Sequence, residues 1–501
     1  MPAQETLPRN NYSANRWRVH GEHGAWQRLK ASFRMRNNTK WWVVLPALAF
    51  MAPGAAMASR HGVSPAPGSV RVLLGRFAGV STLQIEAGTC DLYDGAGREI
   101  GAEHGALALT ASREGISGVL ADGRAISAPS AVAEAVLHAG TDGPVQIAGA
   151  AGPLRAYRGI ITVDCLRGRL RAINTVDMED YLRGVVPAEM GRAPLEALKA
   201  QAVACRTWAE SRMLHARGDW DVTDGTSCQV YGGVAAERPR ASRAVSATAG
   251  VVLTENGVPI EAMFCSNCGG RTAPGGPAAP YLKSVADGAA HPEVIDEDPW
   301  NLSVSADQLA ATLARSGLAR GDSGSIIDIR ITHKDVSGRA TAIDVTWSGG
   351  TSSPMSNPPA GIGGGACPVP MVPEQAGSER DGGGETEVLT GTELRAALGA
   401  SRLRSTLFSV TATADGGFRF DGLGYGHGLG LCQAGAITLA GPTVHEDYQA
   451  ILAHYYSGAV LSREPDIDSA VAEPAAYRSP GPGQLRRRHE VMAREDGSKP
   501  D

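Results

Sequence analysis

The sequence predicts an α+β fold, in which mixed sheets and hairpins pack with a few helices. Short apolar runs bounded by turn residues indicate strands, and they do not alternate regularly with helices as they would around a parallel sheet. One long segment instead repeats its apolar residues at the spacing of a helix. The chain has 501 residues, of which 43% are hydrophobic, and this is enough for a sizeable core. Its net charge of −5 is small, so the composition does not favour nucleic acid as a partner.

The expected strands are spread over the chain. Residues 69–77 and 81–87 are short alternating or apolar runs. Three hairpins are expected at 157–176, at 250–265 and at 326–349, with turns at 166–169, at Asn256-Gly257 and at 335–339. The Asn-Gly pair is a strong signal for a tight hairpin turn.

Helices are expected at four places. Asp177 caps the first, and Glu179 and Asp180 suit the positive end of its dipole. The longest helix runs from Pro194 to about His215, and its core face is formed by Leu195, Leu198, Ala202, Cys205 and Ala209. A third helix lies within 305–317 with Ser305 as its cap, and a fourth follows after 389.

The domain organisation follows from changes in composition. Residues 1–58 form an N-terminal extension with a signal peptide or anchor, and 59–68 form a linker. Residues 69–463 form the main domain, interrupted by a glycine- and proline-rich insertion at about 352–388 that is expected to be flexible. The polar tail at 464–501 is expected to be disordered.

The N-terminal segment indicates export. Residues 41–58 carry no charge, follow a basic stretch and end in Ala56-Met57-Ala58, which fits a secretory signal cleaved near Ala58. An uncleaved anchor and a buried helix are the alternatives. The stretch before the apolar run is long for a signal, so Met35 is a candidate start.

Three glycine-containing islands combine reactive side chains with backbone freedom. The first is YLRGVVPAEM with the helix after it, the second joins DGTSCQVYGG to EAMFCSNCGGRT, and the third is GLGYGHGLGLCQAGA. Within the first, Glu189 follows Val185, Val186 and Pro187 and precedes Met190. Taken singly, Glu189 can be a helix-terminal charge and His427 a turn residue.

Together the islands resemble the family of stage II sporulation protein D and the amidase enhancers. The matching segments are EDYLRGVVPAEM with LEALKAQAVACRT, the CQVY of 228–231, and the glycine-rich run of 424–433. Cys265, Cys268 and Ala434 depart from the residues usual at those positions. The resemblance implies a bacterial envelope protein with its loops around a substrate groove. It also implies peptidoglycan lytic transglycosylase activity, with Glu189 as the catalytic residue.

One carboxyl group is sufficient for that chemistry. The C6 hydroxyl of N-acetylmuramic acid attacks its own anomeric carbon, so the nucleophile is already tethered and no water attacks. Glu189 can then act first as acid and later as base, and apolar neighbours that raise its pKa would suit the first role. The product would carry 1,6-anhydro-N-acetylmuramic acid ends.

The resemblance also indicates residues that contact the glycan or hold a metal. The expected substrate-binding residues are Arg206, Gln229, Tyr231, Ser266, His427 and Gln433. The expected ligands of a structural zinc ion are Cys228, Cys265 and Cys268, where the spacing of the last two suits tetrahedral zinc. A disulfide is the alternative, since export favours oxidation.

A second function remains open at this point. The chain can instead be a non-catalytic wall-binding protein that activates a separate N-acetylmuramoyl-L-alanine amidase. Under either reading its partners are glycan strands in the cell envelope, and contact with a membrane is expected only through the N-terminal segment.

Overall fold

The structure of the chain is a computed structural model. It describes residues 68–93, 99–113, 115–120, 123, 125–128, 134–138, 143–150, 152–216, 218–287, 299–319, 324–348 and 384–463. The signal peptide or anchor and the C-terminal tail that the sequence predicts lie outside these residues. None of the described helices is long and apolar enough to cross a membrane.

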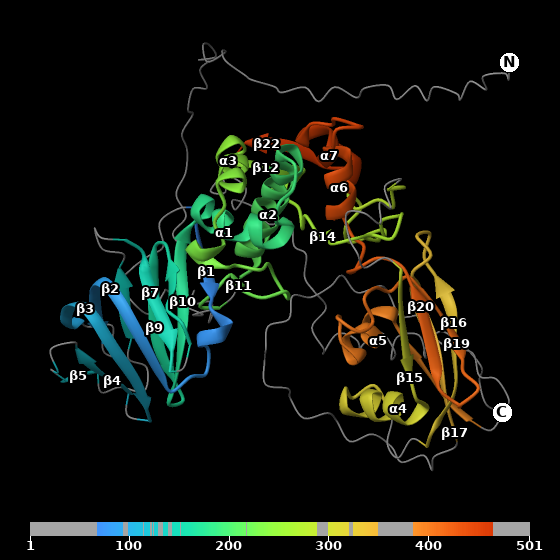
Figure 1. Ribbon diagram of the computed structural model, residues 1–501, viewed down its shortest axis with the longest axis horizontal. Coiled ribbons are helices and arrows are strands. Elements are labelled where there is room, and N and C mark those ends of the chain that lie inside the picture. Colours follow the sequence, from blue (N-terminus) through green and yellow to red (C-terminus); the bar gives the residue numbers. More distant parts are fainter. Residues whose placement is uncertain are drawn as a thin grey trace, which may run out of the picture. The chain divides into compact units, whose positions relative to one another are not determined.

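The predicted α+β class is confirmed, and its first part is a large sheet. Within the described residues eleven strands are hydrogen-bonded in the order β11-β1-β10-β9-β6-β2-β3-β4-β5, with β7 pairing β2 and β8 (Figure 1). The strands are β1 (Ser69–Leu73), β2 (Thr82–Tyr93), β3 (Glu99–Ser112), β4 (Gly115–Leu120), β5 (Ala125–Ala128), β6 (Glu134–His138), β7 (Val145–Gly149), β8 (Arg155–Tyr157), β9 (Ile160–Leu166), β10 (Arg169–Asp177) and β11 (Val222–Thr223). A short 3-10 helix, η1 (Gly75–Phe77), follows β1.

The β9–β10 hairpin is the one predicted at 157–176, and β10 leads directly into the first helix. Its turn places Arg167 and Gly168 at φ of 54° and 72°, values that favour glycine at the second position. Helix α1 (Met178–Met190) begins where Asp177 accepts hydrogen bonds from the amides of Glu179 and Asp180. The predicted cap is therefore confirmed.

Helix α2 (Leu195–His215) is buried on most of its surface. Its small side chains, including Ala200, Ala202 and Ala204, are fully buried, so neighbouring elements can approach its backbone closely. Those neighbours include α1, α3 (Pro239–Ala247) and the β12 strand (Val251–Glu255) (Figure 1). The apolar face expected from the sequence is thus part of a wider buried surface.

The elements around α2 come from the middle and the end of the chain. Strand β12 pairs with β13 (Val258–Pro259) across the predicted Asn256-Gly257 turn and with β22 (Val460–Arg463) on its other edge. Strand β14 (Phe264–Cys265) pairs in parallel with β21 (Leu431–Cys432). The remaining elements here are η2 (Gly233–Ala236), α6 (Gln433–Leu439) and α7 (Tyr448–Tyr455).

A second hydrophobic core lies in the segment between β14 and β21. It is formed by residues from Trp300 to Phe420 that are separate from the first core. Two three-stranded sheets contribute, β15-β20-β19 and β16-β17-β18. Their elements are β15 (Trp300–Val304), α4 (Ala306–Arg315), β16 (Ile326–Lys334), β17 (Ala340–Ser348), β18 (Gly384–Leu389), α5 (Gly391–Leu398), β19 (Phe408–Ala412) and β20 (Phe418–Gly422).

The second core confirms three sequence predictions and corrects one boundary. Ser305 caps α4, β16 and β17 form the predicted hairpin, and α5 follows residue 389. Residues 384–388 were expected to belong to the flexible insertion, but they form most of β18 and pair with β17. Strand pairing thus extends into a glycine-rich segment whose composition indicates a loop. The rest of that predicted insertion lies outside the described residues.

Candidate active site

Glu189 lies in the last turn of α1, at the edge of the first core. Val185, Val186 and Pro187 before it are buried, and Met190 after it is 8% exposed. Glu189 itself is half-buried, while Ala188 beside it is exposed. The helix ends at Gly191, whose φ of 61° suits a residue without a side chain. The local sequence therefore places this carboxyl group between an apolar core and solvent.

Two groups from distant segments hold the carboxylate. The amide of Val230 donates a hydrogen bond to Oε1 of Glu189 at 2.6 Å, and the Gln433 side chain donates another. Burial raises the pKa of Glu189 above its ordinary value, and these two hydrogen bonds oppose that rise. Neither of these partners is a carboxylate, so the geometry presents one acid group held by two neutral donors.

The three islands of the sequence therefore meet at one carboxyl group. Glu189 comes from the first, Val230 from the second and Gln433 from the third. The third is fixed to the rest of the second by the pairing of β14 with β21 and by a hydrogen bond from the Ala434 amide to the Ser266 carbonyl.

Buried side chains of α2 hold Gln433 in place through successive hydrogen bonds. Its amide group lies 3.5 Å from Oε1 of Gln201, and the Gln201 amide donates to Sγ of Cys205 at 3.1 Å. Gln201 is fully buried on α2. Gln201 was not among the predicted site residues, although a glutamine among the alanines of an apolar helix indicates a buried polar partner.

Gln229 and Arg206 lie in the interior, away from the surface where a glycan could bind. Gln229 is fully buried; it accepts from the Tyr181 hydroxyl at 3.2 Å and donates to the Cys205 carbonyl at 3.2 Å. Arg206 is 1% exposed and binds both carboxylate oxygens of Glu179 at 2.7 and 2.8 Å. Their hydrogen-bond partners are protein groups. Their burial therefore contradicts the predicted contact with substrate and indicates that they support the fold instead.

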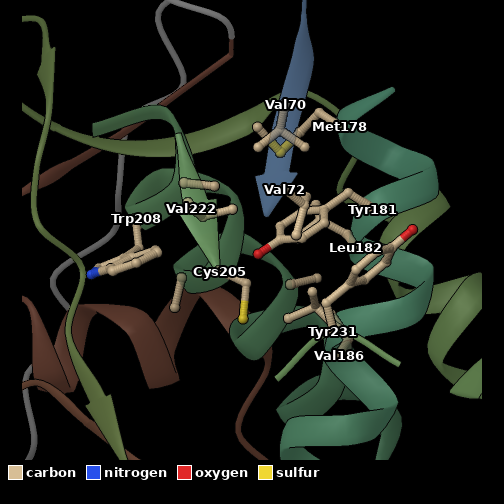
Figure 2. Close-up of a cluster of buried hydrophobic side chains, with 14 of the residues drawn as sticks. Val70, Val72, Met178, Tyr181, Leu182, Val186, Cys205, Trp208, Val222 and Tyr231 are labelled. Carbon is tan, nitrogen blue, oxygen red and sulfur yellow. The ribbon is translucent and has the colours of Figure 1, made fainter. Parts of the chain in front are cut away.

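Tyr231 also belongs to the core. It is 2% exposed, its hydroxyl donates to Oδ1 of Asn174 at 2.9 Å, and its ring lies 5.1 Å from that of Tyr181. Figure 2 shows both rings beside Leu182 and Val186 of α1. As with Gln229 and Arg206, the burial of Tyr231 contradicts the prediction that it contacts substrate.

His427 fixes the glycine-rich loop. The Leu429 amide donates to its Nδ1 at 3.0 Å, and the ring also hydrogen-bonds the Phe264 backbone. Burial, together with the nearby Arg395 and Arg339 charges, lowers the pKa of His427 to about 4. The imidazole is therefore neutral at physiological pH and links the loop to β14. Ser266 is half-buried on the adjoining segment, and its carbonyl accepts a hydrogen bond from the Ala434 amide, next to Gln433.

The predicted zinc ligands are not grouped as expected. The Sγ atoms of Cys268 and Cys432 and a carboxylate oxygen of Asp287 lie within 4.8 Å of one another. Neither Cys228, which is half-buried near Tyr181, nor Cys265 is a member of this group. Within the described residues, Cys268 thus lies with Cys432 and Asp287, and not with the expected partner Cys228.

The chain belongs to the family of stage II sporulation protein D and the amidase enhancers. Residues 166–254, which include Glu189 and Val230, match the family model described as Stage II sporulation protein. The chain is 30% identical over 293 residues to an uncharacterised protein of Brachyspira hyodysenteriae, covering 57% of this chain and 67% of that protein.

Two relatives from Bacillus subtilis carry functional names. The amidase enhancer is 31% identical over 305 residues, which cover 56% of this chain and 40% of that protein. Stage II sporulation protein D is 33% identical over 147 residues, which cover 25% of this chain and 43% of that protein. The matches thus span less than half of each of these two relatives.

Proposed function

We propose that the chain is an exported cell-wall protein that cleaves peptidoglycan glycan strands as a lytic transglycosylase. The observation that carries this proposal is the single carboxyl group of Glu189, half-buried against Val185 and Val186 and held by Val230 and Gln433. Its raised pKa favours the protonated form that a general acid needs.

The reaction requires Glu189 to act twice. As acid, it gives its proton to the leaving O4 of N-acetylglucosamine while the bond from that oxygen to C1 of N-acetylmuramic acid breaks. As base, it takes the proton of the C6 hydroxyl while O6 bonds to C1. The proton count balances without water, and intramolecular attack replaces a second catalytic carboxylate.

Gln433 and Val230 have distinct roles in this scheme. Both donate to Glu189, so they fix the carboxyl orientation in the two protonation states. The interior side chains Gln201 and Gln229 hold these donors in place through hydrogen bonds to Gln433 and to α2. No step in the scheme needs a metal ion.

The substitution Glu189→Gln tests the proposal. Glutamine keeps the size and the Oε1 acceptor for Val230 but cannot transfer the proton, so release of 1,6-anhydro products should fall about 10²–10⁴-fold. The matched control is Glu446→Gln on an exposed loop, which should keep full activity. The measurement is mass spectrometry of products from purified glycan strands, where anhydro ends are lighter than hydrolytic ends by one water.

Activation of an amidase is the second candidate, and the name of the Bacillus subtilis amidase enhancer favours it. An activator should accelerate stem-peptide release by a cell-wall amidase, and Glu189→Gln should leave that acceleration intact. Anhydro-product release by Glu189→Gln within threefold of the parent would remove Glu189 from the mechanism. No anhydro product from either protein, together with faster amidase turnover, would favour the activator.

A further inference from the structure

Three cysteines and one aspartate meet beside the candidate active site. Cys268 and Cys432 are each 1% exposed, Cys265 is 5% exposed and Asp287 is 3% exposed. The Cys268 thiol lies 3.2 Å from Oδ2 of Asp287, and the two groups share the 4.8 Å cluster with Sγ of Cys432. Cys265 lies opposite Cys432 in the β14–β21 pairing, and its thiol hydrogen-bonds that of Cys432.

The donor set matches the preference of zinc. Zinc in structural sites takes four ligands on a tetrahedron, mostly thiolates, with Zn–S bonds of about 2.3 Å, so neighbouring ligand atoms are about 3.8 Å apart. The ligand atoms of Cys268, Cys432 and Asp287 lie within 4.8 Å of one another, so they need to move by about an ångström or less to reach that spacing. The Cys265 thiol adjoins this group through its hydrogen bond to Cys432. Cys265 and Cys268 also have the two-residue separation common in zinc sites.

A metal explains this cluster better than a disulfide does. Cys265, Cys268 and Cys432 are not joined by disulfides, and one disulfide would use only two of the three. The third thiol and the carboxyl group of Asp287 would stay buried together. A buried carboxylate needs a compensating charge, and a divalent cation supplies it.

Hydrogen bonds from the surrounding protein already point at the ligand atoms. The amides of Cys268 and Gly435 lie 3.3 and 3.4 Å from Sγ of Cys432. The Tyr455 hydroxyl donates to Oδ2 of Asp287 at 3.1 Å. A Cβ on Gly435 would collide with Tyr455 and Asp287, so glycine is required here. Such outer partners orient metal ligands and raise metal affinity.

We propose that Cys265, Cys268, Cys432 and Asp287 bind one zinc ion with a structural role, and that Cys228 takes no part. The ion joins β14, the loop at Asp287 and the junction of β21 with α6. Cys432 directly precedes Gln433, so the ion fixes the residue that donates to Glu189. This last consequence depends on the proposed function, whereas zinc binding itself does not.

Metal analysis of the full chain tests the site without an activity assay. Protein purified without added metal should contain about one equivalent of zinc, and Cys268→Ser and Cys432→Ser should fall below about a tenth of an equivalent. Cys228→Ser is the matched control and should keep its zinc. Cobalt added to chelator-stripped protein should give a thiolate charge-transfer band in the parent and in Cys228→Ser but not in Cys432→Ser.

A gentler variant guards against misfolding. Asp287→Asn keeps the size of the side chain, so it should fold, as circular dichroism will show, and release zinc at a lower chelator concentration than the parent. The proposal is overturned if the reduced parent, dialysed against zinc, binds less than about a tenth of an equivalent. Zinc retained by both Cys268→Ser and Cys432→Ser, or lost from Cys228→Ser, also overturns it. Failure of the glycan assay alone would leave the zinc site standing.

Discussion

At the scale of one residue, Glu189 takes its burial from local sequence and its hydrogen bonds from elsewhere. Val185 and Val186 are fully buried in the same helix, and sequence analysis predicted an apolar setting from these neighbours. The donors Val230 and Gln433 come from segments far along the chain. Their contact follows from tertiary packing, which the spacing of residues cannot give.

Because the pKa of Glu189 is raised, the stability of the protein should depend on pH. The folded protein holds this proton more tightly than the unfolded chain, so between the two pKa values stability falls as pH rises. Below the pKa of the unfolded state, ordinarily about 4.3 for glutamate, Glu189 is protonated in both states. Its contribution to stability therefore no longer changes with pH there. Glu189→Gln has no such titration.

The measurement is the melting temperature of both proteins at pH 4 and pH 7. The melting temperature of Glu189→Gln should increase relative to that of the parent as pH rises, so the difference should be larger at pH 7 than at pH 4. A capping or ion-paired carboxylate would give the opposite order, with the parent favoured at pH 7.

At the scale of elements, α1 is positioned by close contact with the segment that supplies Val230. A Cβ on Gly184 would lie 2.6 Å from Cε2 of Tyr231 and 3.1 Å from the Gly233 carbonyl oxygen. The Gly232 amide also donates to the Gly184 carbonyl at 3.2 Å. Glycine at this helical position therefore permits the approach on which the site depends.

Gly184→Ala tests that packing. Alanine is the better helix former by about 1 kcal/mol, but overpacking should reverse this and destabilise the protein by about 1–3 kcal/mol. Gly218→Ala is the control, because its Cβ would meet nothing within 4 Å. Denaturant unfolding measures both; equal stability of Gly184→Ala and the parent would contradict the packing described.

The elements themselves were largely predictable. Asp177 and Ser305 cap helices as expected, and Asn256-Gly257 forms a hairpin turn, because these signals act over a few residues. Side-chain direction within 228–231 was not predictable. There burial alternates, so that Gln229 and Tyr231 point inward, and polar side chains with interior partners look in sequence like surface ones.

At the scale of the molecule, an arginine links the segment of the second core to the loop of Cys268 and Arg271. Arg339 lies between β16 and β17 and is 2% exposed. It donates to the Cys268 carbonyl at 2.6 Å and the Arg271 carbonyl at 3.0 Å. The planar guanidinium reaches both carbonyls, which a lysine ammonium does not reproduce.

Arg339→Gln should therefore destabilise the protein by about 2–4 kcal/mol, because buried carbonyls lose charged donors. Arg330→Gln is the control on β16, because its side chain is 69% exposed and forms an ion pair with the exposed Asp328; its effect should stay within about 0.5 kcal/mol. Thermal unfolding followed by tryptophan fluorescence measures both. Equal losses of stability in the two variants would show that Arg339 does not support the loop of Cys268 and Arg271.

The hydrogen bond between Gln433 and Glu189 also bears on how the protein can be divided for experiments. The stretch that matches the family model, residues 166–254, contains the carboxyl group but not Gln433. Its β12 also pairs with β22 at the end of the described chain. An expression fragment cut to the family match would thus expose an edge of β12 and leave Glu189 without one donor. Boundaries that keep 68–463 together retain both.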